Sequence, residues 1–328
     1  MKIGKTRLSL VLPAIWAAAW GSAAPEAAAQ AYPSKNIQMI VPYTAGGSID
    51  LMARTIAQRL SAMWGKNVVV ENRAGASGMI GAELATKAEP DGYTLLATTS
   101  SYPATAAVRA KLPFDPVKAI VPVAMIARAP MLLAIHPSLP VKSVKELVAF
   151  AKKNPGKLNY SSSGTGGNNH FTGALFAAAA GIKLQHVPYK GIAQAVTALA
   201  SGEVEMVISS SASLLPQIKA GRVRILGVSS LKPTPLFPNL PAIAQSGVPG
   251  YEYHLWWAIF APAGLPADRI AFINAAVNKI LASDDMKKFV DVQGAEPWPL
   301  TPSQLADLLP KEIAHYKKAA QIAGIPPQ

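Results

Sequence analysis

The sequence has no cysteine and few acidic residues. Its 328 residues include 31 Lys and Arg but only 18 Asp and Glu, and charged residues make up just 15% of the chain. Without cysteine the chain cannot be a disulfide scaffold, a zinc ribbon or a thiol-dependent enzyme. Half of the residues are hydrophobic, which argues against disorder because such a chain can bury a core. The length is about twice that of a typical domain and predicts two lobes.

The N-terminal segment has the layout of a secretory signal peptide. Three basic residues stand among the first seven, an apolar run covers residues 8–20, and small residues follow as far as Ala31. This order of basic, apolar and small-residue regions is typical of an exported protein. We expect residues 1–29 to be removed, with cleavage after Ala29 or after Ala31. The alternative, a membrane anchor, is weaker because the run is shorter than the roughly 20 residues that span a bilayer.

The charge of the mature chain remains strongly positive. Loss of residues 1–29 removes three of the 31 basic residues and one of the 18 acidic residues, so the formal charge falls from +13 to +11. The basic residues are scattered rather than clustered, which is not the pattern of a nucleic-acid-binding surface. We therefore expect no nucleic-acid partner and interpret the charge as a field that attracts small anions. Export and the lack of cysteine are compatible with the bacterial periplasm.

Predicted strands and helices alternate along the mature chain. The first series has strands over residues 37–41, 68–71 and 94–98, with helices over 50–63 and 79–88 between them. A proline-rich connection is expected over 113–122. The second series has strands over 131–135, 158–162, 184–187, 204–208 and 223–228, with helices over 143–153, 171–180, 193–201 and 214–220. A strand over 253–261 could lead back, and helices over 267–282, 284–292 and 303–324 finish the chain. This alternation predicts two α/β units, each with a parallel sheet covered by helices.

Two glycine-rich segments follow predicted strands and precede predicted helices. They are residues 42–50 (PYTAGGSID) and residues 161–170 (SSSGTGGNNH). Glycine lets the backbone approach a ligand closely, and the N-terminus of the following helix offers free N–H groups and a positive dipole end that suit an anion. The alternative for the first segment is an ordinary turn with Ser48 or Asp50 as the N-cap. The second segment carries more hydroxyl and amide donors, which favours a binding role.

Several kinds of active site are absent from the sequence. Neither glycine-rich segment has the Lys-Ser/Thr pair of a P-loop, and Gln185 and His186 stand where a dinucleotide site needs an acidic residue. The five histidines lie far apart and show no metal-binding spacing, so we expect no cofactor and no metal. Ser163 and His170 could form a nucleophile and base, but no acid is in sight to orient the histidine. We therefore expect a binding protein rather than an enzyme.

Short motifs in a fixed order extend through nearly the whole mature chain. They comprise IVPY at 40–43, GG at 46–47 with Asp50, VENRAGASG at 70–78, PDGYTLL at 90–96, SSGTG at 162–166 with His170, HVPYKG at 186–191, PQIKAG at 216–221, PAIAQSG at 241–247 and APAGLP at 261–266. In this joint order the chain resembles the Bug family of extracytoplasmic solute receptors, the TctC-type binding proteins of tripartite tricarboxylate transporters.

The resemblance implies a fold, a function and partners. The fold is that of periplasmic binding proteins, a Venus flytrap of two α/β domains joined by crossing segments, with the ligand cleft between them. Domain 1 would comprise residues 32–128 and 257–328, and domain 2 residues 129–256. The implied function is capture of a small carboxylate by domain closure in the periplasm, and its delivery by a monomeric receptor to a tripartite-transporter permease. Alternatives are presentation of the ligand to a membrane sensor kinase and, from the pair of Ser163 and His170, a secreted hydrolase.

The resemblance also implies ligand-binding residues, which lie in the two glycine-rich loops and in segments near the same cleft. They are Tyr43, Ala45, Gly46, Gly47, Ser48, Ile49, Asp50, Ala76, Ser77, Ser100, Ser163, Gly164, Thr165, Gly166, Asn168, His170, Tyr189, Lys190 and Ser209.

The sequence departs from the family pattern at two places. Ser48 and Ile49 replace a common Gly-Thr pair, and the strand over 204–208 lacks an aspartate that could meet an amino or hydroxyl group. The apolar Ile49 would narrow or dry that side of the pocket, and the missing aspartate favours a plain carboxylate over an amino acid. Trp256 and Trp257 would either add an aromatic wall to the cleft or pack between the domains.

Overall fold

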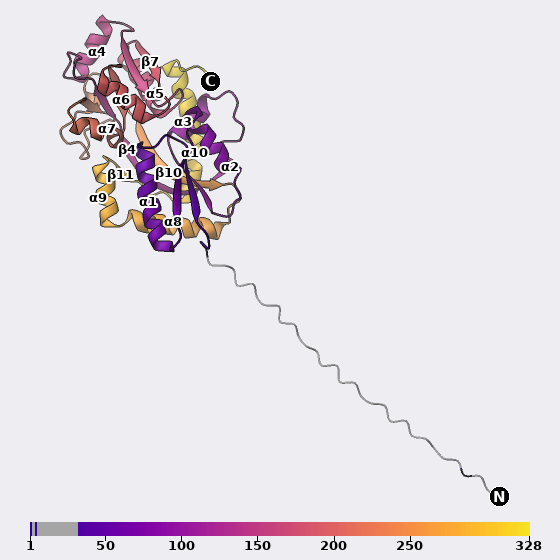
Figure 1. Cartoon of the computed structure of the whole chain (residues 1–328). Helices are drawn as coiled ribbons and strands as arrows, with labels where there is room; N and C mark the ends of the chain where they lie inside the picture. Colours follow the sequence, from indigo (N-terminus) through magenta and orange to yellow (C-terminus); the bar gives the residue numbers. More distant parts are fainter. Residues whose placement is uncertain (2–3, 5–31) are drawn as a thin grey trace. The chain divides into compact units, whose positions relative to one another are not determined.

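The computed structural model describes residues 1, 4 and 32–328. The predicted signal peptide and its cleavage points lie outside these residues. Residues 33–328 build one unit that contains two β-sheets, shown in Figure 1. Within the described residues, no helix combines the length and the apolar character needed to cross a membrane.

The first sheet combines a parallel half with an antiparallel half. Its strands are β1 (Ile37–Val41), β2 (Val68–Asn72), β3 (Thr94–Thr99), β4 (Ile120–Pro130), β10 (His254–Pro262) and β11 (Glu296–Pro297), in the order β11-β4-β10-β3-β1-β2. β1 lies parallel to both β2 and β3, which confirms the predicted βαβαβ series. β10 pairs antiparallel with β3 and β4, so the strand expected to lead back does join this sheet.

Helices cover the first sheet on both faces. They are α1 (Ser48–Trp64), α2 (Met79–Thr86), α3 (Ser101–Val108), α8 (Ala267–Leu281), α9 (Asp284–Val292) and α10 (Pro302–Ala323). Alternate residues of a strand point to opposite faces, and the face that holds Ile40 and Leu96 packs against α2, α3 and α10. α1 contacts α8. It buries Ile56 and Leu60 completely and ends at Gly65, which takes the left-handed conformation common after helices.

The second sheet is smaller and mixed. Its strands are β5 (Leu132–Ile135), β6 (Leu158–Ser162), β7 (Leu184–Pro188), β8 (Met206–Ser209) and β9 (Arg224–Val228), in the order β7-β6-β8-β5-β9. β6 is parallel to β7 and β8, whereas β5 runs antiparallel to β8 and β9. The accompanying helices are α4 (Val144–Lys153), α5 (Asn168–Ala180), α6 (Ile192–Ser201) and α7 (Ser211–Lys219). The core of this part joins Leu199, Val207 and Leu214 from three elements.

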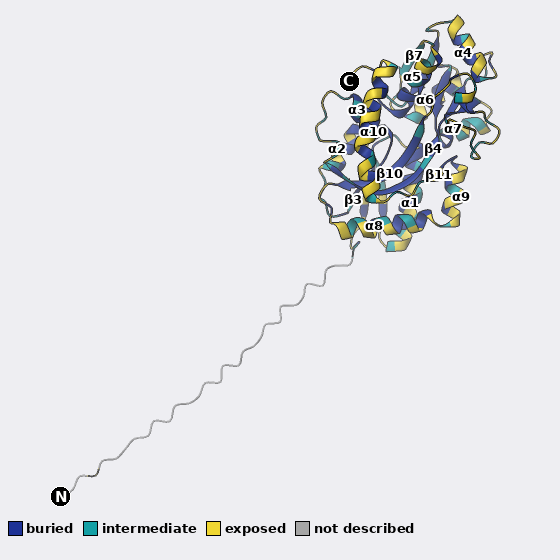
Figure 2. Ribbon diagram, turned by 180° about the vertical axis from the view of Figure 1, so that it is seen from behind, coloured by how far each residue is buried: buried dark blue, intermediate teal, exposed yellow. Residues whose placement is uncertain are grey.

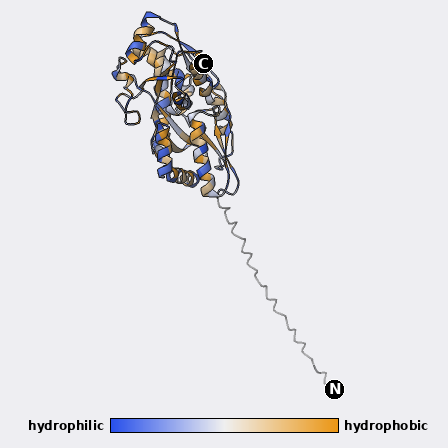
Figure 3. Ribbon diagram, turned by 60° about the vertical axis from the view of Figure 1, so that its left-hand side comes forward, coloured by the Kyte–Doolittle hydropathy of each residue, from blue (hydrophilic) through white to orange (hydrophobic). Residues whose placement is uncertain are grey.

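The burial and hydropathy of the chain follow this arrangement. Figure 2 shows buried strands, while exposed positions gather on helices such as α8 and α10. Figure 3 shows that the helices carry both hydrophobic and hydrophilic residues. Helices such as α9 and α10 thus turn an apolar side inward and a polar side to water, whereas α3 is buried over nearly its whole length.

The two segments that connect the sheets are hydrogen-bonded to each other. The chain leaves the first sheet at Pro130 and enters the second at Leu132, and it returns between β9 and β10. Ser229 ties both crossings together, because its N–H donates to Met131 O (2.8 Å) and its hydroxyl accepts from Met131 N (2.7 Å). The same hydroxyl donates to Tyr253 O (2.5 Å). The domain boundaries at 128/129 and 256/257 stay a prediction.

Some elements differ from the expectations. The connection expected over 113–122 contains the start of β4, and the predicted elements omit α3 entirely. Proline is rare inside strands because it lacks an N–H donor. Pro122 lies beside a register shift between β4 and β10, where a strand can accommodate a residue that donates no hydrogen bond. The helix expected over 143–153 begins at Val144, and Ser143 is its N-cap. The Ser143 side chain accepts from Glu146 N, whereas the Glu146 carboxylate accepts from Lys142 N.

Burial predicts how two leucines differ in their effect on stability. Leu60 is fully buried, whereas Leu84 on α2 is 45% exposed. We expect Leu60→Ala to lower the free energy of unfolding by about 2–5 kcal/mol through lost burial and the resulting cavity. Leu84→Ala, the same chemical change at the surface, should cost less than about 1 kcal/mol. Urea unfolding followed by circular dichroism measures both, and equal losses would contradict the described packing of α1.

Candidate functional site

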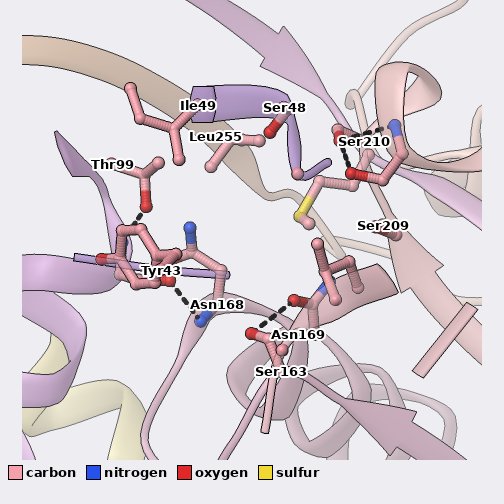
Figure 4. Close-up of a pocket in the computed structure, with 16 residues that line it drawn as sticks. Tyr43, Ser48, Ile49, Thr99, Ser163, Asn168, Asn169, Ser209, Ser210 and Leu255 are labelled. Atoms are coloured by element: carbon pink, nitrogen blue, oxygen red, sulfur yellow. Dashed lines mark hydrogen bonds between the residues drawn. The ribbon is translucent and has the colours of Figure 1, made fainter. Parts of the chain in front are cut away.

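A pocket lies where the loops of the two sheets meet. Its cavity volume is about 50 Å³. Elements around the first sheet contribute Tyr43, Ser48 and Ile49, and elements around the second contribute Asn168 and Ser209. Figure 4 shows these side chains around a common space. The pocket lies beyond the carboxyl ends of β1, β3, β6 and β8, which is where open α/β sheets bind ligands.

Five helices begin at this pocket. α1, α3, α5, α6 and α7 each place a residue of their N-terminal cap or first turn in its wall. The start of a helix carries free N–H groups and a partial positive charge. None of the residues that line the pocket has a charged side chain. The arrangement therefore favours an anion that is held by helix dipoles and hydrogen bonds rather than by ion pairs.

Apolar side chains complete the wall of the pocket. Ile49 and Leu255 lie across it from Ser163 and Asn169 in Figure 4. Met131 and Ile192 add further apolar surface. The pocket thus has a polar side that suits an anionic group and an apolar side that suits a carbon chain.

The Asp50 carboxylate holds the loop after β1 by hydrogen bonds. The Asp50 carboxylate accepts from Gly46 N (3.0 Å), Arg54 Nε (3.1 Å) and Asn72 Nδ2 (2.9 Å), and the residue is only 3% exposed. Burial by itself would raise the pKa of Asp50, but the hydrogen bonds from Arg54, Gly46 and Asn72 outweigh it and lower the pKa below the usual value. The ionised carboxylate therefore stabilises the loop instead of facing a ligand.

Hydrogen bonds also join the loop after β6 to elements of the first sheet. Asn168 N donates to Ser101 Oγ, and Asn168 Nδ2 donates to Ser100 Oγ, both at 3.0 Å. Ser77 Oγ donates to Thr165 O at 2.8 Å. These bonds connect the two lobes beside the pocket.

The predicted ligand-binding residues fall into three groups. The first group lines the pocket: Tyr43, Gly47, Ser48, Ile49, Ser163, Asn168 and Ser209. The second lines a neighbouring pocket of about 490 Å³, which shares Tyr43 and Ser163 with the first: Ala76, Ser77, Gly164, Thr165, Tyr189 and Lys190. The third is absent from the lining of both: Ala45, Gly46, Asp50, Ser100, Gly166 and His170. Their binding roles stay a prediction.

Other residues of the pocket were not named as ligand-binding residues from the sequence, although Asn169 belongs to the second glycine-rich segment. They are Thr99, Ser101, Met131, Asn169, Gly191, Ile192, Ser210, Ser213 and Leu255. A signal existed for Ser210 and Ser213, because the polar run 209–213 stands between a strand and a helix like the two glycine-rich loops. Met131, between β4 and β5, and Leu255, at the start of β10, gave no signal, since apolar residues in or next to strands look like core residues.

The polar groups considered for hydrolysis are not arranged for it. Ser163 Oγ donates to Asn169 Oδ1 (3.0 Å), whereas His170 Nδ1 accepts from Gly166 N (3.1 Å). Burial lowers the pKa of His170 to about 4. Trp256 and Trp257 are buried outside the pocket, where their indole N–H groups donate to Glu312 Oε2 and to Ser48 Oγ.

Comparison with known proteins relates the chain to a set of receptors. Residues 52–325 match the family model described as "Tripartite tricarboxylate transporter family receptor", TctC. The protein BugT of Bordetella pertussis is 35% identical over 321 residues, which cover 97% of this chain and 98% of BugT.

Two solved structures have the same fold. The structure of R. palustris Rpa4515 with adipate has a TM-score of 0.88 and 38% identity, and the match covers 90% of this chain and all of that one. The periplasmic binding protein BugD has a TM-score of 0.85 and 29% identity, with the same coverage. The Venus-flytrap fold is thereby confirmed. The matched proteins are receptors and binding proteins, which confirms the expectation of a binding protein rather than an enzyme.

The Asp50 network predicts a pH-dependent contribution to stability. Because its pKa is lowered in the folded protein, the carboxylate stabilises the fold above pH 3.8, and this contribution is lost as the pH falls through the lower folded value. Asp50→Asn replaces one carboxylate oxygen, which accepts hydrogen bonds, by an NH₂ group, which donates them. We therefore expect it to lower the free energy of unfolding by about 1–3 kcal/mol at pH 7. The difference from wild type should shrink below pH 3.8.

Urea unfolding at pH 7 and pH 3 measures this contribution. The matched control is Asp284→Asn, because the Asp284 side chain is 91% exposed. If both variants lose the same small amount at pH 7, the Asp50 network does not stabilise the loop.

The contact of the two lobes depends on Gly191. Its φ of −176° suits any residue, but an added Cβ would lie 2.0 Å from Thr44 Oγ1 and 3.0 Å from Thr44 Cβ. We expect Gly191→Ala to push the lobes apart and to raise the radius of gyration in small-angle scattering. Thr44→Ala removes the two closest atoms and should restore most of the compactness. Gly167→Ala is the control, because its Cβ would have no neighbour closer than 3.4 Å. An unchanged radius in Gly191→Ala would show that the lobes do not meet there.

Proposed function

The chain belongs to the family of tripartite tricarboxylate transporter receptors, and we propose that it captures a small carboxylate between its lobes and delivers it to the permease of such a transporter. It is a solute-binding receptor of the TctC and Bug type. The predicted signal peptide and the periplasmic location named for BugD support a place in the periplasm.

The convergence of five helix N-termini on a pocket without charged side chains carries this proposal. A carboxylate carries the negative charge that such a site attracts. Each hydrogen bond to a charged group contributes roughly 1.5–3 kcal/mol, and micromolar binding needs about 8 kcal/mol. Several N–H and hydroxyl donors from the two loops could supply this, even after the cost of ordering them.

The related structure suggests a ligand for the first test. Rpa4515 of R. palustris, which is 38% identical, was solved with adipate, a linear acid with two carboxylates. The pocket of about 50 Å³ is smaller than such an acid but adjoins the larger pocket through Tyr43 and Ser163. We infer that one carboxylate lies at the helix N-termini and that the carbon chain contacts the apolar wall, with the lobes closing by a hinge motion.

Calorimetric titration tests the proposal. We expect heat of binding with adipate or with another acid from a panel of succinate, glutarate, hexanoate and benzoate. Ser209→Asp should abolish it, because Ser209 is 1% exposed and lines the pocket, and an added carboxylate there would repel the ligand. Ser303→Asp, on the exposed first turn of α10, introduces the same charge elsewhere and should bind like wild type. A folded protein that releases no heat with any acid of the panel would overturn the proposal.

A further inference from the structure

Two stacked histidines lie behind the loop that follows β6. His170 belongs to α5 and is 7% exposed, and His186 belongs to β7. Their ring centroids are 3.9 Å apart with an interplanar angle of 12°. Tyr160 of β6 stacks on His186 at 5.0 Å. Neither histidine lines the pocket, so the function proposed above leaves this stack unexplained.

Both rings are hydrogen-bonded to the loop. Gly166 N donates to His170 Nδ1 at 3.1 Å. His186 Nε2 is bonded to Ser162 Oγ at 2.6 Å, and the same hydroxyl accepts from Gly164 N at 3.1 Å. These bonds fix the backbone on either side of Ser163, whose side chain does line the pocket.

The bond from Gly166 requires an uncharged His170. An imidazole nitrogen accepts a hydrogen bond only when it carries no proton. Protonation of Nδ1 would place two donors against each other and would put a charge within 3.9 Å of the His186 ring. Burial lowers the pKa of His170 to about 4, and burial together with His170 lowers the pKa of His186 to about 3. Both rings are therefore neutral at pH 7.

The surroundings offer no countercharge to a protonated ring. A cavity of about 440 Å³ borders His170 and is walled by β6, α5, the segment from α5 to β7 and the end of α10. The titratable groups that face it, apart from His170, are Tyr160 and Lys183 among the described residues. Neither is a carboxylate, so an imidazolium would gain no ion pair there. The cavity itself gives protons access to the ring.

We propose that His170 is a positioning residue for the ligand-binding loop and that it holds the loop only while uncharged, so that acid releases both the loop and the ligand. His186 supports it by stacking and by its bond to Ser162. The part of this inference that concerns ligand release rests on the function proposed above. The part that concerns the loop stands on the contacts alone.

Hydrogen exchange at the Gly166 amide shows whether its bond to His170 is formed, and this measurement needs no ligand. We expect its hydrogen-exchange protection, measured by NMR in the folded protein, to decrease in wild type as the pH falls from 7 toward 4, relative to reference amides in α1. His170→Asn keeps an acceptor oxygen but cannot take up a charge, so its Gly166 protection should not depend on pH. His170→Leu removes the acceptor and should lower the protection at pH 7 about tenfold, the loss of one hydrogen bond. His315→Asn on exposed α10 is the matched control.

Two results would overturn the proposal. One is a His170→Asn protein whose Gly166 amide responds to pH as in wild type. The other is a folded His170→Leu protein with undiminished protection. If His170→Leu does not fold, the comparison of His170→Asn with wild type still decides.

Titration with adipate extends the test to binding. Between pH 7 and pH 4, the dissociation constant of wild type should rise about twofold more than that of His170→Asn, because about half of His170 is protonated when the pH equals its pKa of about 4. Protonation of adipate itself affects both proteins equally and cancels in this comparison. Equal changes in the two proteins would show that His170 does not control ligand release. If adipate does not bind at pH 7, that result counts against the proposed function, whereas the Gly166 amide still decides the role of His170.

Discussion

Residues at the start of five helices line one small pocket, and much of the surrounding structure serves to bring these helix starts together. Because no charged side chain lines the pocket, the helix starts can attract an anion together only if they lie close to one another. Close approach explains why Gly47 and Gly191 stand where the two lobes meet, since an added Cβ at Gly191 would collide with Thr44.

Buried polar groups behind the loops keep these helix starts in place. Asp50 holds the loop after β1, His170 and His186 hold the loop after β6, and Ser229 ties the crossings. Gly166 and Met131 are buried, so without His170 and Ser229 their N–H groups would lack a partner, which costs about 1–3 kcal/mol per group. A loop without a hydrophobic core of its own can thus stay ordered. The net positive charge plays a different part, because it acts at a distance and attracts anions toward a site that contains no cation of its own.

Much of the fold could be predicted from sequence patterns. The strand β6 and the helix α9 have the bounds that periodicity and turn residues indicate, and glycines close α5 and α6 as expected. The errors have physical reasons. α5 and α7 start three residues before the predicted positions, because the polar residues of their first turns, such as Asn168 and Ser211, resemble loop residues in sequence. β4 was obscured by Pro122, which a shift of register accommodates.

The sequence by itself determined the class of fold, the family resemblance and the two loops, since each depends on residues that are near neighbours along the chain. Only the tertiary structure decided which side chains of those loops face the pocket. Asp50 and His170 belong to the predicted segments, yet both turn away from the pocket and hold backbone N–H groups instead. Met131 lies in the crossing between β4 and β5, Leu255 lies at the start of β10, and both line the pocket. The direction of a side chain depends on partners that are distant in sequence, such as Asn72 for Asp50, and a local pattern carries no record of them.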